Sequence, residues 1–177
     1  MRLVKCRNAK QLKFIKALYI DAFPEEERKP FSLILKKSEE GKADIMAIED
    51  SEEGFLGLAI TVLHKDIVLL DYFAVRPNCR GRRVGSCAIS LLKDKYEGKR
   101  LVIEIEDTEE ASANREERIR RKSFYLKNGM KEMRYRVWLF GVKMQILTNG
   151  AEISFDEYHQ IFDSVFSNGT GKNVIKA

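Results

Sequence analysis

The sequence predicts an α/β fold of the mixed α+β kind, with one sheet and helices on both of its faces. Stretches with apolar residues at helical spacing alternate with short apolar or alternating runs that are typical of strands. The run at 66–75 is almost continuously apolar, as expected of a central strand. A chain of 177 residues that is 44% hydrophobic can build one domain with a substantial core.

The N-terminal part of the chain predicts one strand and two helices. "LVKC" at 3–6 is typical of a short strand, and residues 9–22 carry apolar side chains at helical spacing. "FPEEERKPF" follows, and its two prolines end that helix. A second helix is predicted for 32–40, with Gly41 as its stop signal.

The middle of the chain predicts a meander of three strands. The runs are "ADIMAIED", "GFLGLAITVLH" and "DIVLLDYFAV", and acidic residues or glycine separate them. A helix is predicted next, at 85–96, and a further strand, "RLVIEIE", at 100–106. This order places a loop, 75–86, between the central strand and a helix.

The C-terminal part predicts a charged helix, two late strands and a closing helix. The charged helix and the two strands are expected within 111–129, 133–140 and 142–147. Ser154 and Glu157 form a capping-box pattern, which predicts that a helix begins there and covers 155–166.

Composition excludes several classes of protein. A net charge of +5 is only mildly basic, so wholesale nucleic-acid binding is not favoured. The three cysteines form no Cys-x-x-Cys pair, and His64 and His159 lie far apart, so we expect neither a disulfide framework nor a metal site. The N-terminus lacks the apolar core of a signal peptide, and no apolar run is long enough to span a membrane. We therefore expect a cytoplasmic protein without a membrane partner.

The segment "VRPNCRGRRVGS", residues 75–86, carries the main functional signal. It lies between a predicted buried strand and the start of a helix. Helix N-termini offer unpaired N–H groups and a positive dipole end, glycine lets a ligand approach the backbone, and arginine binds phosphate oxygens. The segment is neither a Walker loop nor a dinucleotide fingerprint, because the residues and glycine spacing differ. It predicts an anion-binding loop; a basic surface turn is the alternative.

This segment resembles the acyl-CoA-binding motif of the GNAT N-acetyltransferase superfamily, Arg/Gln-x-x-Gly-x-Gly/Ala after a Val-x-Pro strand end. Arg83 departs from it, since the family usually has glycine there. "SFYLKNGM", 123–130, resembles the family's Phe-Tyr-x-x-x-Gly-Phe segment, and the resemblance extends over 1–148. The matching positions in the loop are Val75, Pro77, Arg80, Gly81, Gly85 and Ser86.

The resemblance implies a fold and a domain plan. It implies a GNAT-like central sheet, mixed and splayed, of about seven strands flanked by helices, with an extra C-terminal helix. The acyltransferase domain is expected at 1–150, and 151–177 are expected to add a helix and tail to the same domain.

The resemblance also implies a cosubstrate, acetyl-CoA, and residues that hold it. The pantetheine arm is expected to pair with the backbone near Phe73, Ala74 and Val75, and Asn114 is expected to contact the cosubstrate by family habit. The pyrophosphate is expected on the loop residues Arg80, Gly81, Arg82, Arg83, Val84, Gly85 and Ser86.

Tyr125 matches the family's usual general acid, which protonates the departing thiolate. Helical geometry places it on the side of Arg118, Arg121 and Lys122, about 100° from Leu126. Nearby cations favour the phenolate, so we expect a lowered pKa. A core tyrosine at a helix end is the alternative.

Asp71 and Glu104 are the two candidates for the base that deprotonates the acceptor amine. Asp71 interrupts an apolar strand on the same face as Phe73, and Glu104 lies between Ile103 and Ile105 in the next strand. An acid in a buried strand is costly unless it has a partner or a function. Solvent-facing acids on half-exposed strands are the alternative for both.

These residues predict an N-acetyltransferase that moves an acetyl group from acetyl-CoA to a primary amine on a small molecule or peptide. One alternative is a nucleic-acid-binding module built on 114–136, where cations and aromatic residues are interleaved. Another is a relative that binds CoA without catalysis, which Arg83 keeps open. A homodimer is a further expectation, and the helix after Ser154 is a candidate for its interface.

Overall fold

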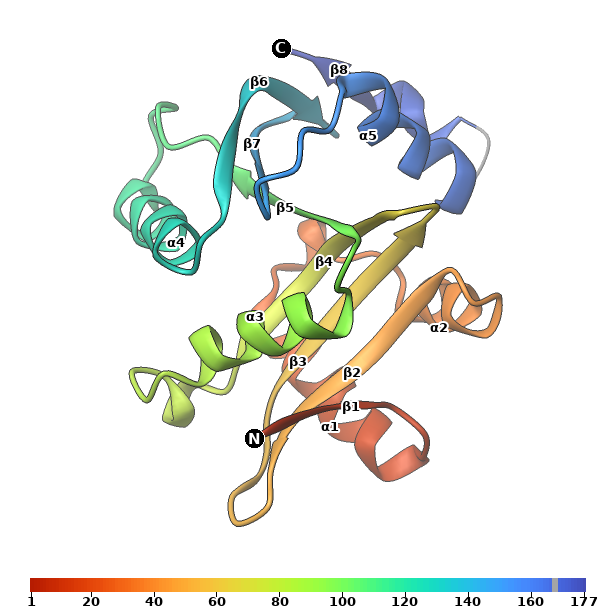
Figure 1. Ribbon diagram of the computed structural model, residues 1–177, viewed down its shortest axis with the longest axis vertical. Coiled ribbons are helices and arrows are strands. Elements are labelled where there is room, and N and C mark those ends of the chain that lie inside the picture. Colours follow the sequence, from red (N-terminus) through yellow and green to blue (C-terminus); the bar gives the residue numbers. More distant parts are fainter. Residues whose placement is uncertain (167–168) are drawn as a thin grey trace. The chain divides into compact units, whose positions relative to one another are not determined.

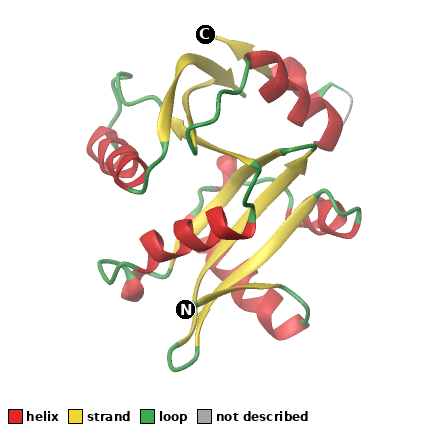
Figure 2. Cartoon of the chain, in the orientation of Figure 1, coloured by secondary structure: helices red, strands yellow, loops and turns green. Residues whose placement is uncertain are grey.

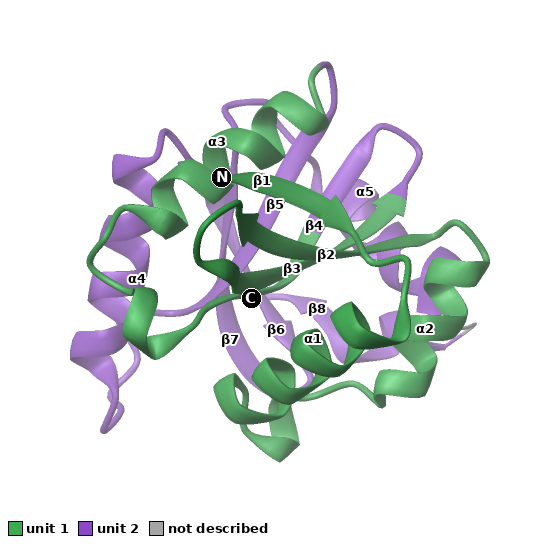
Figure 3. Cartoon of the chain, turned by 90° about the horizontal axis from the view of Figure 1, so that it is seen from below, with its two compact units in different colours: residues 1–63, 70–97 green, residues 64–69, 98–177 purple. Residues whose placement is uncertain are grey.

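The computed structural model describes residues 1–166 and 169–177 (Figure 1). The chain forms two compact units, which Figure 3 colours separately. Unit 1 contains residues 1–63 and 70–97, and unit 2 contains residues 64–69 and 98–177. The segment 151–177, expected as a helix and tail, belongs to unit 2, and its residues 167 and 168 lie outside the described part.

Unit 1 is built from four strands and three helices. Figure 2 shows the helices of the chain in red and its strands in yellow. The elements of unit 1 follow the predicted order, and the helix expected at 9–22 has those bounds. The elements are β1 (Arg2–Lys5), α1 (Ala9–Ala22), α2 (Phe31–Glu39), β2 (Ala43–Asp50), β3 (Gly54–His64), β4 (Ile67–Val75) and α3 (Val84–Lys95). Strand β4 begins in unit 2 and continues into unit 1 at residue 70.

Helices cover both faces of the sheet in unit 1. On one face, Tyr19 of α1 and Ile34 of α2 pack against Leu58 of β3 and Tyr72 of β4. On the other face, Val84 and Ala88 of α3 pack with Ile48, Leu56 and the buried Cys79. Figure 1 shows α3 running across the face of the sheet that α1 does not cover.

Unit 2 contains the remaining strands and two helices. Its elements are β5 (Arg100–Glu106), α4 (Arg115–Lys127), β6 (Lys131–Leu139), β7 (Val142–Thr148), α5 (Phe155–Ile161) and β8 (Val174–Lys176). Ser154 caps α5 with the predicted capping box: its hydroxyl accepts from Glu157 N–H, and the Glu157 carboxylate accepts from Ser154 N–H. One π-helical turn, Phe162–Phe166, continues α5.

The strand order is β1-β2-β3-β4-β5-β7-β6-β8, which forms one open sheet. Strands β1 and β3 both pair antiparallel with β2, and β6 pairs antiparallel with both β7 and β8. The predicted mixed α/β class is confirmed. The described residues hold eight strands rather than about seven, because β8 adds three residues to the edge at β6.

No helix in the described ranges combines the length and the apolar character needed to cross a lipid bilayer.

Candidate functional site

The end of β4 is fixed by a close approach of β3. A Cβ added to Gly57 would lie 2.4 Å from the Ala74 carbonyl oxygen and 3.2 Å from the Val75 Cα. The Arg76 N–H donates to the Leu56 carbonyl at 2.9 Å. The chain therefore leaves β4 along a path that only glycine at position 57 allows without displacement.

The loop after β4 is anchored at its start. Residues Pro77–Cys79 form a single 3₁₀ turn, and the buried Cys79 packs against α3. The Arg80 Nε donates to the Val75 carbonyl at 3.2 Å. Arg83 then takes a left-handed conformation, with φ 62°, immediately before α3. The family's usual glycine suits this conformation, and the arginine adopts it at a cost of about 1–2 kcal/mol.

The start of α3 presents unpaired backbone donors. The N–H of Cys87 makes the first bond of the helix, to the Arg83 carbonyl at 3.0 Å. The N–H groups of Gly85 and Ser86 donate to no residue within the described part of the chain. Because α3 is 12 residues long, its dipole adds a positive potential at these donors. The arrangement can bind an anion such as a phosphate.

The arginines of the loop are not equivalent. Arg82 is bidentate to the Glu53 carboxylate, with Nη1 at 2.7 Å from Oε2 and Nη2 on Oε1. The guanidinium of Arg83 makes no hydrogen bond or ion pair with any described residue. A hollow of about 260 Å³ is lined by Arg82 and Arg83 and also by Met1, Asp50 and Glu53, and Asp50 pairs with the N-terminal ammonium of Met1. The guanidinium groups of Arg80 and Arg83 remain for a phosphate.

Asp71 is a buried carboxylate in unit 1. Its side chain is 3% exposed, and its Oδ1 lies 2.6 Å from the Nζ of Lys29. Its Oδ2 is buried and has no hydrogen-bond partner among the described residues. The solvent-facing alternative is therefore wrong for Asp71. Sequence reasoning missed Lys29, because 42 residues separate it from Asp71 and no local pattern links them.

Glu104 lies on β5 in unit 2, opposite Ile146 of β7. The hydroxyl of Tyr158 on α5 donates to its Oε1 at 2.6 Å. Tyr158 is fully buried, so the contact joins Glu104 to the core of unit 2. One of the two carboxylate oxygens is thus already a hydrogen-bond acceptor.

Tyr125 is buried on α4, with 7% of its surface exposed. Burial raises its pKa to about 12, and the Arg121 guanidinium offsets this only in part. The expected lowering of the pKa is therefore wrong, and the neighbouring Leu126 is exposed. A phenol with this pKa carries its proton at neutral pH and can donate it.

The cations near Tyr125 are paired with acidic side chains. Arg118 and Arg121 both pair with the Glu106 carboxylate, at 2.6 and 3.1 Å. Lys122 pairs with Glu132 at 2.6 Å. These pairs also neutralise much of the cationic stretch 114–136, which argues against a continuous track for nucleic-acid phosphates.

Asn114 lies directly before α4. Its carbonyl accepts from the N–H groups of Glu117 and Arg118, at 3.0 and 3.1 Å. Its side chain makes no capping bond and is partly exposed. It therefore supports the helix start through its backbone, and its amide group is available to a ligand.

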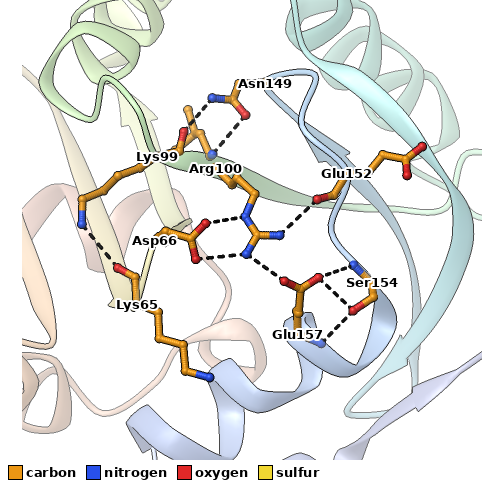
Figure 4. A network of polar contacts seen from close by, with 9 residues as sticks. Lys65, Asp66, Lys99, Arg100, Asn149, Glu152, Ser154 and Glu157 are labelled. Atoms are coloured by element: carbon orange, nitrogen blue, oxygen red, sulfur yellow. Dashed lines mark hydrogen bonds and ion pairs between the residues drawn. The ribbon is translucent and has the colours of Figure 1, made fainter.

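Arg100 shows a guanidinium group that serves structure alone (Figure 4). Both oxygens of Asp66 accept from it, at 2.7 and 3.0 Å, and Glu157 accepts at 2.8 Å. The Glu152 carbonyl accepts at 3.1 Å. Arg100, aided by hydrogen bonds from Ser154, lowers the pKa of Glu157 to about 2. This network ties the start of β5 to the start of α5.

Within residues 1–166 and 169–177, no group of three or more His, Cys, Asp or Glu side chains is arranged to hold a metal ion.

Several solved structures are similar to the fold of this chain. A candidate acetyltransferase of the GNAT family from Bacteroides thetaiotaomicron matches with a TM-score of 0.76 and 18% identity, over 91% of this chain and 93% of its own. A chimera built from a Vibrio cholerae spermidine N-acetyltransferase and hSSAT matches with a TM-score of 0.64 and 14% identity, over 84% and 94%. The chain has the GNAT fold.

A third GNAT-fold match is an aminoglycoside 6'-N-acetyltransferase complexed with coenzyme A. Its TM-score is 0.64 at 13% identity, over 87% of this chain and 100% of its own. No protein-family model matches the chain, and a search of curated proteins found no match. The predicted GNAT-like architecture is confirmed by these structural matches, although their sequence identities to this chain are only 13–18%.

Proposed function

We propose that the protein is an N-acetyltransferase that moves an acetyl group from acetyl-CoA to a primary amine. The observation that carries this proposal is the loop before α3, where the unpaired N–H groups of Gly85 and Ser86 meet the guanidinium of Arg83. An anion is the ligand that these groups suit, and acetyl-CoA carries a pyrophosphate.

Binding of acetyl-CoA is assigned to unit 1. The pyrophosphate accepts from the N–H groups of Gly85 and Ser86, with Arg80 and Arg83 as additional donors. The pantetheine arm follows the backbone of residues 73–75 at the end of β4. A backbone N–H there polarises the thioester carbonyl and stabilises the oxyanion that forms on attack.

Asp71 is the base that we favour for the acceptor amine. Its Oδ2 is buried and accepts no hydrogen bond from a described residue, so it is available to a proton. Each carboxylate has one oxygen already engaged, Asp71 by Lys29 and Glu104 by the Tyr158 hydroxyl. Glu104 is less favoured because only Asp71 has a buried second oxygen without a hydrogen-bond partner among the described residues. The deprotonated amine attacks the thioester, the C–S bond breaks, and Tyr125 protonates the thiolate.

The acceptor class follows from chemistry and from the GNAT-fold matches. Two of these are acetyltransferases named for spermidine and for aminoglycosides, both of which are amines. A carboxylate base such as Asp71 also suits a cationic amine, which it attracts before it accepts the proton. We therefore propose a primary amine on a small molecule or peptide as the acceptor.

Calorimetric titration with acetyl-CoA, followed by an amine screen that reads free thiol, tests the proposal. The Tyr125→Phe variant is expected to lose about 100-fold in turnover with unchanged affinity for acetyl-CoA. Tyr135→Phe is the matched control, because burial also raises the pKa of Tyr135 to about 12 and its hydroxyl has no role in the proposed reaction. Absence of heat at saturating acetyl-CoA would remove the proposal, and binding without thiol release would leave a non-catalytic CoA-binding protein.

A further inference from the structure

The segment between α1 and α2 is fastened to the core at Lys29. The Lys29 N–H donates to the Tyr72 hydroxyl at 2.9 Å, and the Tyr19 hydroxyl donates to the Lys29 carbonyl at 2.8 Å. The Tyr72 hydroxyl in turn donates to the Glu27 carbonyl at 3.1 Å. Tyr19 and Tyr72 are both buried, so they hold the backbone of Lys29 in one place.

The side chain of Lys29 brings a primary amine to the carboxylate that we favour as the base. Its Nζ lies 2.6 Å from the Asp71 Oδ1 and 5.3 Å from the centre of the Tyr72 ring. Asp71 is almost fully buried, whereas 23% of the Lys29 side chain is exposed. Two hydrogen bonds to its backbone and an ion pair at its tip thus position the amine in advance.

The same strand places this amine close to the proposed thioester. Asp71 and Phe73 are two residues apart on β4, so their side chains point to one face with about 7 Å between the two positions. The pantetheine arm is assigned to residues 73–75. An amine already in contact with Asp71 therefore lies within reach of an acetyl group held at the end of β4, all within unit 1.

We propose that Lys29 is acetylated in cis by the acetyl-CoA that the protein binds. The inference rests on the proposed function. Asp71 takes a proton from the Lys29 ammonium, and the freed Nζ attacks the thioester carbonyl. The N–C bond forms, the C–S bond breaks, and the CoA thiolate takes up a proton. The products are an acetyl-lysine amide and free CoA.

Acetylation changes the environment of Asp71. The amide at Lys29 is neutral, so the ion pair with Asp71 is lost and the carboxylate no longer has that cation as its partner. Lys29 is the first amine to accept an acetyl group. Until it does so, its ammonium competes with external amines for the Asp71 carboxylate.

Peptide mass spectrometry after incubation with acetyl-CoA tests this inference. Acetylation of Lys29 is expected at a rate that does not change when the protein is diluted, because the reaction is intramolecular. Lys16 is the matched lysine: its Nζ lies 5.9 Å from the centre of the Phe31 ring, and no ion pair with a described carboxylate positions it. Lys29 is expected to react about 100-fold faster than Lys16, because only Lys29 is positioned on a base.

Two variants complete the experiment. Asp71→Asn is expected to slow acetylation of Lys29 about 100-fold, and Lys29→Arg keeps a cation on Asp71 but accepts no acetyl group. Circular dichroism checks that both variants fold. Equal labelling of Lys29 and Lys16, or a rate proportional to protein concentration, would overturn the inference.

Acetyl-CoA binding, measured separately by calorimetry, distinguishes the two proposals. If acetyl-CoA binds and external amines release thiol while Lys29 stays unmodified, the inference fails and the proposed function stands. If acetyl-CoA does not bind, both fail.

Discussion

Arg100 in unit 2 and Arg83 in unit 1 differ in what their guanidinium groups bind. Arg100 donates to Asp66, Glu157 and the Glu152 carbonyl, which occupy the whole guanidinium fork. The guanidinium of Arg83 has no partner among the described residues, although it lies in an arginine-rich loop. Both lie at the start of a regular element: Arg100 is the first residue of β5, and Arg83 directly precedes α3.

The comparison teaches that arginine density by itself does not reveal a binding site. Arg82 stands beside Arg83 in the same loop, yet Glu53 on the β2–β3 turn accepts from both of its terminal nitrogens. The distinguishing property is a guanidinium left without a protein partner beside backbone N–H groups that are also unpaired. Only the loop before α3 shows this combination among the arginine sites compared in the described chain.

Gly57→Ala is expected to have the largest effect on the loop before α3. Its Cβ would press on the Ala74 carbonyl at 2.4 Å, and this backbone group cannot rotate away. We expect a loss of about 3 kcal/mol in stability by chemical denaturation, and weaker acetyl-CoA binding, because the end of β4 shifts. Gly98→Ala is the control: its Cβ would meet nothing within 4 Å, so only the cost of φ 76° remains, about 1 kcal/mol. Equal effects of the two variants would contradict the close approach.

Arg100→Ala tests the arginine whose guanidinium is fully occupied by protein acceptors. Removing the guanidinium leaves Asp66 and Glu157 without their cation, but both carboxylates are more than a third exposed and water compensates in part. We expect a loss of about 2 kcal/mol in the free energy of unfolding and no change in acetyl-CoA affinity. Weaker acetyl-CoA binding with unchanged stability would contradict a purely structural role for Arg100.

Arg83→Ala tests the arginine whose guanidinium has no partner among the described residues. We expect about tenfold weaker binding of acetyl-CoA by calorimetry, because one charge-assisted bond to phosphate is lost, with no loss of thermal stability. Arg83→Gly removes the same guanidinium while suiting the left-handed conformation, so it separates the side chain from the backbone cost. Arg82→Ala is the matched control and should affect binding less, since Glu53 already occupies Arg82.

Glu157→Gln is expected to have the smallest effect, confined to acid. The folded pKa of Glu157 is about 2, below its ordinary value of 4.5, so its contribution is complete above pH 4.5 and is lost as the pH falls toward 2. Solvent screening limits this contribution to about 1 kcal/mol. Thermal unfolding between these pH values should show a shallower acid decline for the variant than for the unchanged protein. Identical declines would contradict the lowered pKa.

Local sequence signals predicted most of the fold. The capping box at Ser154 and Glu157 and the bounds of α1 depend on residues within a few positions of one another, and both are confirmed. Strand β8 was missed because three residues carry no periodicity, and their pairing with β6 comes from far along the chain.

The candidate site was less predictable where partners are distant in sequence. The loop before α3 was identified from its own residues, and its left-handed Arg83 agrees with the family's glycine at that position. The partner of Asp71 was not predicted, because Lys29 reaches it only through the tertiary fold. The direction of the Tyr125 pKa shift was wrong because the tertiary fold buries the phenol, and this desolvation outweighs the Arg121 charge.

The division of β4 constrains how the protein can be made and cut. The chain passes from one unit to the other at 63–64, 69–70 and 97–98, so neither unit is a continuous stretch of sequence. When synthesis has reached residue 97, the part of β4 that belongs to unit 2 is already made. Its neighbouring strand β5 is not yet made. No single cut of the chain separates the two units with both of them whole, so separate expression of the units would require a rearranged gene.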